Sequence, residues 1–366
     1  MKAKTYSLLL TALLTTACGK GGASYSLLQD GETFRQNSAT QNAKIDVLWV
    51  IDNSGSMLSS QQNLTQNFPS FINKFLAKGL DFQMAVTTSQ AYLSLPAFTP
   101  YYNSTPRPAY YEGQAQDWIA KFRDGAPGVH SGQFVLTPQT PQLLDVFMTN
   151  AMQGTNGRGD ERSLQSMRAT LESAHNAGFV RPGGFLAVIL LTDEDDFSHD
   201  GTAMYERYDR PLHTIDSYVQ FLDGITGSSA AARHYTVNTI SVNNQACLDS
   251  INNGVQKIGV RVGQLAEATG GVKGNICGNF AEELDLISRS IVELSTQFPL
   301  GDRKPIAETI KVYVNGVAIP NVAANPANNG GWYYNESANS IVFQGDYVPA
   351  QGATIKVNFD PRELTI

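Results

Sequence analysis

The sequence IDVLWVIDNSGS, residues 45–56, sets the architecture of this protein. Its first seven residues are apolar except for Asp46 and form a nearly continuous hydrophobic run. Such a run is typical of a strand buried on both faces of a parallel sheet, because a sheet with one wet face alternates apolar and polar residues. The residues from Asp52 to Ser56 are polar or small, so the strand is expected to end at Ile51 in an oxygen-rich turn.

Strand-like and helix-like segments alternate from this run as far as residue 300. Further strands are predicted at residues 82–88, 185–191 and 235–242, with a short edge strand at 134–137. Apolar residues at helical spacing predict helices at 64–76, 141–152, 164–174, 260–268 and 281–297, and Pro69 should kink or divide the first of these. This alternation predicts an α/β domain at residues 44–300, with a doubly wound, mainly parallel sheet and an insertion at about 90–133.

The hydrophobic period changes after residue 300. Apolar residues alternate with polar ones at 310–314, 341–343 and 355–359, and Asn315-Gly316 is typical of a type I′ hairpin turn. Residues 301–366 are therefore expected to form a small, β-sandwich-like all-β module. So short a module is only marginally stable alone, so we expect it to pack against the α/β domain.

The N-terminal residues have the pattern of a secretory signal. Lys2 and Lys4 precede an apolar run at 6–14, and small residues follow up to Ala17, which predicts a signal peptide at residues 1–17. The Ala17-Cys18 junction resembles the lipobox of bacterial lipoproteins, although a threonine stands where the usual leucine would be. The resemblance implies that Cys18 carries a lipid and, because Gly19 follows it, that the protein lies at the outer membrane; without lipidation it would be secreted. Residues 18–43, rich in Gly, Ser, Gln and Asn, are expected to be a flexible tether.

The net charge of the chain disfavours one class of partner. The 366 residues carry 26 Lys+Arg against 33 Asp+Glu, a net charge of −7, which argues against nucleic acid as a partner.

Besides Cys18, the chain has only Cys247 and Cys277. In an oxidising compartment a disulfide between them is the default expectation, and two buried free thiols are the alternative.

Three polar segments follow or connect the predicted strands and can meet at one edge of the sheet. Asp52, Ser54 and Ser56 form a D-x-S-x-S pattern after the first strand, Thr155 lies in the loop before the helix at 164–174, and Asp193 follows the strand at 185–191. Ligands of doubly wound sheets bind at the carboxyl ends of the strands. Hydroxyl and carboxylate oxygens suit hard cations, so these five residues are candidate ligands of Mg²⁺ or Mn²⁺.

These three segments, in this order, resemble the von Willebrand factor A domain and its metal-ion-dependent adhesion site, which integrin I domains also contain. The resemblance covers residues 44–300. It implies that Ser54, Ser56 and Thr155 contact the cation, that Asp52 and Asp193 act directly or through water, and that a protein partner supplies a carboxylate. Many family members continue T-D-G where this chain has T-D-E-D-D at 192–196. Glu194, Asp195 and Asp196 either bind a second cation such as Ca²⁺ or are solvated loop acids, and their negative field opposes an acidic partner.

Other signals are open to more than one interpretation. The aromatic residues of the insertion form either a recognition surface or the packing of a long loop. Arg158-Gly159-Asp160 matches the tripeptide that integrins recognise, but its position next to a helix start favours a structural role, with Asp160 and Glu161 suiting the helix dipole. The histidines show no zinc spacing, and no nucleophile elbow or P-loop is present.

The sequence therefore predicts a membrane-anchored, extracytoplasmic adhesion or binding protein and not an enzyme. One alternative is a Mg²⁺-dependent phosphohydrolase that uses Asp52. The other is a purely structural metal site, with the β module as the binding surface.

Overall fold

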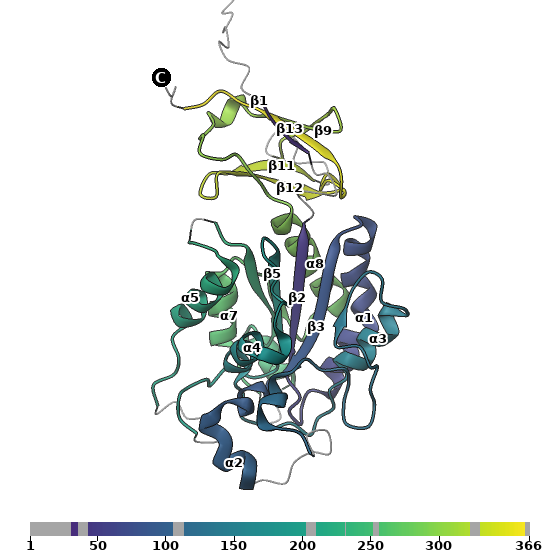
Figure 1. Cartoon of the computed structure of the whole chain (residues 1–366), viewed down its shortest axis with the longest axis vertical. Helices are drawn as coiled ribbons and strands as arrows, with labels where there is room; N and C mark the ends of the chain where they lie inside the picture. Colours follow the sequence, from purple (N-terminus) through teal and green to yellow (C-terminus); the bar gives the residue numbers. More distant parts are fainter. Residues whose placement is uncertain are drawn as a thin grey trace, which may run out of the picture.

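A mixed, mostly parallel sheet forms the centre of the computed structural model, which describes residues 31–35, 43–104, 113–202, 210–230, 232–251, 256–322 and 330–362 (Figure 1). The strand order is β4-β3-β2-β5-β6-β7. The strands are β2 (Lys44–Ile51), β3 (Asp81–Thr88), β4 (Val135–Leu136), β5 (Phe185–Leu191), β6 (Tyr235–Ser241) and β7 (Lys273–Asn275). Only β4, at one edge, is antiparallel to its neighbour. The predicted α/β class is confirmed.

The packing of strand β2 explains the apolar run in its sequence from Val47 to Ile51. Val47, Trp49 and Ile51 lie in the hydrophobic cluster on one face of the sheet, and Leu48 and Val50 lie in the cluster on the other. All five side chains are completely buried. A strand covered on both faces has no position left for a solvated side chain.

Helices cover both faces of the sheet (Figure 1). The apolar side chains of α1 (Leu58–Ala77), α3 (Leu143–Ala151) and α8 (Phe280–Ser295) belong to one cluster, and those of α4 (Ser163–Glu172), α5 (Ile215–Thr226) and α7 (Val260–Ala268) belong to the other. Helix α6 (Gln245–Ile251) is shorter. Pro69 does not divide α1, which runs through it as one helix. The neighbouring Phe68 and Phe71 are fully buried and stack on aromatic neighbours, so packing outweighs the lost backbone hydrogen bond.

The insertion after β3 packs on itself. It contains η1 (Ala91–Ser94), η2 (Pro96–Phe98), α2 (Thr99–Ser104) and η4 (Gln116–Ala120). Its buried side chains form a third hydrophobic cluster that includes Tyr92, Phe98, Tyr102 and Ile119. Of the two interpretations of the aromatic residues, the structure favours loop packing for those it describes; Tyr110 and Tyr111 lie outside the described residues.

The C-terminal part consists of two small antiparallel sheets. One has the order β1-β13-β9-β10 and the other β11-β12-β8. Their strands are β1 (Gly31–Arg35), β8 (Phe298–Pro299), β9 (Lys311–Val314), β10 (Val317–Ile319), β11 (Gly330–Asn335), β12 (Ser340–Gly345) and β13 (Thr354–Asn358). Asn315 and Gly316, between β9 and β10, both have positive φ, as a type I′ turn requires.

Strand β1 corrects the expectation of an unstructured tether at 18–43. Residues 31–35 pair antiparallel with residues 354–358 of β13, from Gly31 opposite Asn358 to Arg35 opposite Thr354. We call β1 together with residues 298–362 the β module. Cys18 and the signal peptide lie outside the described residues.

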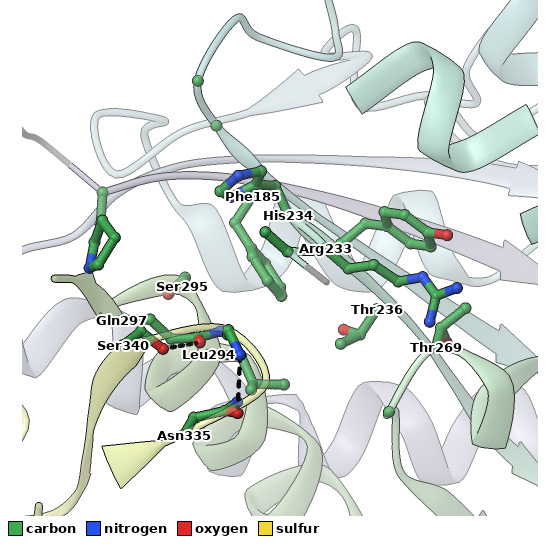
Figure 2. Close-up of a pocket in the computed structure, with 18 of the residues that line it drawn as sticks. Phe185, Arg233, His234, Thr236, Thr269, Leu294, Ser295, Gln297, Asn335 and Ser340 are labelled. Carbon is green, nitrogen blue, oxygen red and sulfur yellow. Dashed lines mark hydrogen bonds between the residues drawn. The ribbon is translucent and has the colours of Figure 1, made fainter. Parts of the chain in front are cut away.

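The β module packs on the amino-terminal edge of the central sheet (Figure 1). The Lys78 ammonium, at the end of α1, donates to the carbonyl oxygen of Val348 at 2.8 Å, and the Gly345 amide donates to Glu293 of α8 at 3.1 Å. Between the two parts lies a groove of about 350 Å³, lined partly by Arg233, His234 and Ser340 (Figure 2). No helix among the described residues is long and apolar enough to cross a membrane.

Candidate functional site

The candidate site lies at the opposite edge of the sheet, where the parallel strands end together. Ile51 of β2 is level with Thr88 of β3 and with Leu191 of β5. The residues that follow these strand ends are Asp52, Ser89 and Thr192. Backbone hydrogen bonds continue the register past the strands, from the Asp52 amide to the Leu191 carbonyl at 2.9 Å and from the Ser89 amide to the Ile51 carbonyl at 3.2 Å.

The structure brings together four of the five candidate ligands. One Asp52 oxygen accepts from the Ser54 amide at 2.8 Å, and the other accepts from the Thr192 hydroxyl at 3.0 Å. The Ser56 hydroxyl lies 3.4 Å from that of Ser54 and donates to Asp193 at 3.1 Å. Asp52 is completely buried, and Ser54 and Asp193 are nearly so, while Ser56 is partly open to solvent.

Thr155 lies in a loop held against this turn by Gln61 of α1. The fully buried Gln61 amide donates to the carbonyl oxygens of Asp52 and Gly154, at 3.0 and 2.9 Å. The Gly157 amide also donates to the Asn53 carbonyl at 2.7 Å. Within the described part of the chain, no hydrogen bond links the half-buried Thr155 to Asp52, Ser54, Ser56 or Asp193. The loop is in place, but its hydroxyl is not joined to the other candidates.

Glu161 is the site residue that the sequence interpretation missed. Its side chain is 1% exposed, and within the described structure neither carboxylate oxygen has a hydrogen-bond partner. The charges that act on it most strongly are those of Asp52, Glu194 and Asp193, all acids. Burial first, and these neighbours second, raise the pKa of Glu161 well above its usual range. A hydrogen bond between Glu161 and Asp52 forms only if one of the two is protonated, because two ionised carboxylates have no donor.

Burial and neighbouring acids also raise the pKa values of Asp193 and Glu194. Burial, followed by the charge of Asp52, raises the pKa of Asp193 to about 6. Burial, then Asp52 and Asp193, raise the pKa of Glu194 to about 8, and Lys257 opposes this shift. Asp52 itself has a raised pKa because it is fully buried, although the Ser54 amide counteracts the shift. Asp52, Glu161, Asp193 and Glu194 are thus buried acids with raised pKa values, and without a cation they favour protonation.

Asp195 and Asp196 have other partners. Asp195 accepts from the Arg261 amide in the first turn of α7 at 2.8 Å, and Asp196 accepts from the Leu164 amide in the first turn of α4 at 2.9 Å. Asp196 also accepts from the Ser198 hydroxyl at 2.8 Å. Both carboxylates therefore stabilise helix N-termini. Both are buried, so they are not solvated loop acids, and the second cation stays a prediction.

Two further motifs have structural roles. Asp160 of the Arg-Gly-Asp tripeptide is 4% exposed and accepts from both Tyr92 and Arg158 at 3.1 Å, so it is not displayed for recognition.

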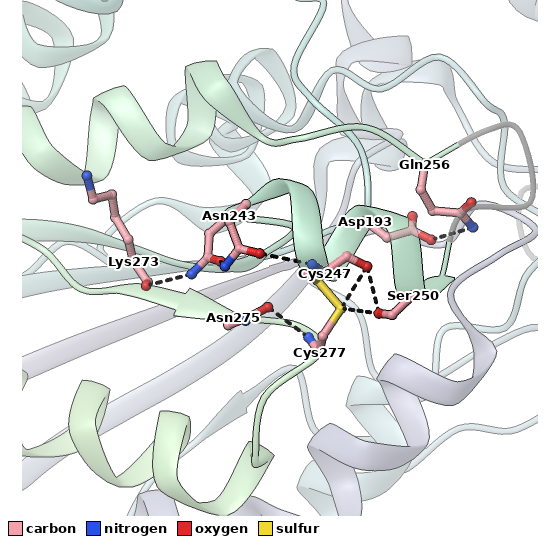
Figure 3. The surroundings of a disulfide bond; sticks show 9 residues. Asp193, Asn243, Cys247, Ser250, Gln256, Lys273, Asn275 and Cys277 are labelled. Atoms are coloured by element: carbon pink, nitrogen blue, oxygen red, sulfur yellow. Dashed lines mark hydrogen bonds between the residues drawn. A yellow bond between two sulfur atoms is a disulfide. The ribbon is translucent and has the colours of Figure 1, made fainter.

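The predicted disulfide is confirmed between Cys247 and Cys277 (Figure 3). Beyond α6, which carries Cys247, Gln256 donates to Asp193 at 3.2 Å, so this region also contacts the site (Figure 3).

The donor set fits a hard divalent cation. Among the described residues, no three His, Cys, Asp or Glu side chains are close enough to hold a metal by themselves. The Ser54 and Ser56 hydroxyls stand beside the acids, however, and the Glu161 oxygens lack the donor that a buried carboxylate requires. A cation among Ser54, Ser56, Asp193, Asp52 and Glu161 would supply that missing positive charge.

No protein-family model matches this chain, and no curated protein matches it either. Among solved structures, it is similar to the pilus adhesin SpaC of Lactobacillus rhamnosus GG in the open conformation, at 9% identity over 90% of this chain and 42% of that chain, with a TM-score of 0.41. It is also similar to the pilus adhesin RrgA of Streptococcus pneumoniae (9% identity, 92% and 58% coverage, TM-score 0.28) and to the human COPII-coat protein Sec24c (11% identity, 92% and 42% coverage, TM-score 0.33). The chain spans less than two thirds of the length of each of these proteins. Similarity at this level supports no conclusion about function.

Proposed function

We propose that this chain is a von Willebrand factor A-type binding protein that engages a protein partner through a divalent cation, Mg²⁺ or Mn²⁺, at the carboxyl edge of its central sheet. The observation that carries the proposal is the group of buried acids around Asp52, in which the described residues offer the Glu161 carboxylate no hydrogen-bond donor. Folding such a group is costly unless a positive charge joins it. The bound cation supplies an electrophilic centre to which a partner group can attach.

The chain's own residues define how this site is held. Ser56 is the most accessible of the four clustered candidates, so it marks the side from which a partner approaches. Asp52 lies behind it, fixed by Ser54 and Thr192. The Gln61 side chain and the Gly157 amide bind the backbone of the neighbouring loops, and these hydrogen bonds hold the site in place.

The cellular setting is part of the proposal. Cys18 would anchor the protein by a lipid at the outer membrane, and the Cys247–Cys277 disulfide suits an oxidising compartment outside the cytoplasm. With its site at the opposite end of the strands from the β module, the domain presents a binding edge and acts in adhesion or scaffolding.

A phosphohydrolase is less well supported. Asp52, its candidate nucleophile, is 0% exposed, and both carboxylate oxygens already accept hydrogen bonds from neighbouring groups. A nucleophile needs a free oxygen within reach of the substrate. The binding function is therefore better supported than the phosphohydrolase.

Partner capture from envelope extracts tests this function. Wild type in Mg²⁺ should retain a specific protein, while EDTA or Asp52→Ala should abolish its recovery. Asp302→Ala, an exposed acid of the β module, serves as the matched control and should behave as wild type. Because Asp52 is buried and its loss could unfold the domain, Ser56→Ala provides a second variant, which removes only hydroxyl contacts. Recovery unaffected by EDTA and by Ser56→Ala would overturn metal-dependent binding.

A further inference from the structure

The groove between the α/β domain and the β module has the features of a second binding site (Figure 2). Its volume of about 350 Å³ falls in the range of about 300–1,000 Å³ that small-molecule sites occupy. The chain carries 33 acidic residues, yet none of the described residues that line the groove is an Asp or a Glu, whereas Lys44, Arg233 and His234 all line it. The groove therefore has a basic lining in an otherwise acidic protein.

Two of these basic residues stand on either side of a pair of glycines. Lys44 begins β2, and Arg233 lies two residues before β6. Strand β5 pairs with both β2 and β6, and Gly183 and Gly184 immediately precede it. Both glycines line the groove and contribute no side chain, so the floor between the two basic residues stays low.

Lys44 supplies the positive charge that a ligand can use. Its ammonium has no hydrogen-bond or ion-pair partner among the described residues. The acids nearby are already paired with arginines, Asp223 with Arg233 at 3.4 Å and Asp46 with Arg181 at 2.6 Å. The charge of Lys44 is therefore not balanced by either of these acids.

The facing wall, formed by the end of α8 and the β11–β12 hairpin, adds two amide donors. The Asn335 side-chain oxygen accepts from the Ser337 hydroxyl at 2.7 Å and from the Ala338 amide at 3.2 Å. The Gln297 side-chain oxygen accepts from the Ser340 hydroxyl at 3.0 Å (Figure 2). Within the described structure, neither side-chain nitrogen has an acceptor. Because their oxygens are occupied, these two amides have N–H groups to offer a ligand.

The serines of the same wall offer acceptors. Ser337 and Ser340 donate their protons to these amide oxygens, and Ser295 donates to the Val292 carbonyl at 3.1 Å. Each hydroxyl then has only lone pairs left, which accept from O–H groups of a ligand. A ligand that satisfies both kinds of group carries an anion and hydroxyls together.

We propose that this groove binds the phosphate ester of a small polyol, with glycerol phosphate as the simplest example. A phosphate has three strong acceptor oxygens, which match the three donors Lys44, Gln297 and Asn335. The same chemical group occurs in free phosphate esters and in the headgroup of phosphatidylglycerol. The groove lies at the opposite end of the central strands from the candidate cation site, so this inference does not depend on the proposed function.

Calorimetric titration of sn-glycerol 3-phosphate into the full chain tests the site. The buffer contains EDTA, so that phosphate cannot bind through a metal ion. Wild type should bind the ester, and Lys44→Gln should weaken binding by about tenfold, as loss of a charged hydrogen bond predicts. Lys311→Gln removes an exposed lysine of β9 and should stay within about twofold of wild type.

Gln297→Glu tests the facing wall with almost no change in shape. The variant keeps an acceptor for Ser340 but replaces the N–H donor by a negative charge, so it should weaken binding by at least about tenfold. Gln139→Glu makes the same change at an exposed position outside the groove and should behave as wild type. Melting temperatures equal to that of wild type would show that the losses are not unfolding.

Further titrations define the ligand. Glycerol and inorganic phosphate should each bind wild type about tenfold more weakly than the ester, because each lacks one half of it. Vesicles distinguish the two sources of the group. A preference of the full chain for phosphatidylglycerol over phosphatidylcholine vesicles, lost in Lys44→Gln but kept in Lys311→Gln, would identify the lipid headgroup. Binding of the ester without that preference would identify a soluble ester.

The proposal fails if wild type neither binds the ester nor prefers phosphatidylglycerol vesicles. It also fails if Lys44→Gln and Gln297→Glu bind the ester as tightly as their matched controls, because the ligand then lies elsewhere. Glycerol binding as tight as that of the ester would refute recognition of an anion. Phosphate binding as tight as that of the ester would refute recognition of the polyol.

Discussion

Raising the pH of the metal-free protein should destabilise it, and Asp193 gives the size of the effect. The pKa of Asp193 is about 6 in the folded protein, against an ordinary value of 3.8. The folded state therefore holds the Asp193 proton more tightly than the unfolded chain does. The resulting stabilisation is fully present below about pH 4 and is lost as the pH rises through 6.

The magnitude follows from the shift. Each pKa unit is worth about 1.4 kcal/mol, so the shift of roughly two units amounts to about 3 kcal/mol of unfolding free energy. For a chain of this length that corresponds to about 4 °C in Tm. Asp193→Asn cannot titrate, so the free-energy difference between variant and wild type should change by about 3 kcal/mol in favour of the variant between about pH 4 and about pH 8.

Thermal unfolding in EDTA, followed by circular dichroism at both pH values, measures this difference. Comparison of the two proteins cancels groups that titrate in both, including His199, whose lowered pKa acts in the opposite direction. Adding Mg²⁺ at about pH 8 should then stabilise wild type more than Asp193→Asn, since the cation binds the ionised site. A variant-to-wild-type difference that stays constant with pH would refute the argument that Asp193 is buried among repelling acids.

Three further substitutions test how the site is built. Gly157→Ala should lower stability by about 1–3 kcal/mol and weaken Mg²⁺ binding, because its Cβ would overlap the Asn53 carbonyl; chemical denaturation and calorimetry measure the two effects. Gln61→Leu should cost about 2–4 kcal/mol in the same denaturation assay, since it leaves several buried backbone groups of the two site loops without partners. Cys277→Ser should cost roughly 3–4 kcal/mol through the disulfide that spans 30 residues, and a Tm unchanged from wild type would contradict this.

The central strands could be predicted because their neighbours on both faces demand apolar side chains. The run at 185–191 became β5 with the expected bounds, and every residue in it is buried. Helix α5 was not anticipated, since among its twelve residues only Tyr218 and Leu222 are buried and the apolar pattern is short. The expectation that Pro69 would divide the first helix was wrong, because local backbone chemistry gave no information about the aromatic packing around it.

Contacts between segments that are distant in the sequence account for the remaining differences between the sequence predictions and the structure. Strand β1 has a polar, tether-like sequence, and its pairing partner β13 lies more than 300 residues further along the chain, so no local period could reveal it. Glu161 was interpreted as a helix-dipole residue because it stands two residues before α4. Only the fold shows that its side chain turns towards Asp52. The sequence offered no signal for this, because Glu161 stands between Arg158 and Arg162 and reads as an ordinary charged residue before a helix.

Strand β1 precedes the α/β domain in sequence and β13 follows it, yet the two pair in one sheet. A pull on the chain ahead of residue 31 therefore acts first on the backbone hydrogen bonds between β1 and β13, and not on β2 in the middle of the central sheet. If Cys18 is the point of attachment, mechanical load on the anchored protein is carried by the β module. The proposed binding edge lies at the far end of the central strands, away from the point where the chain is pulled.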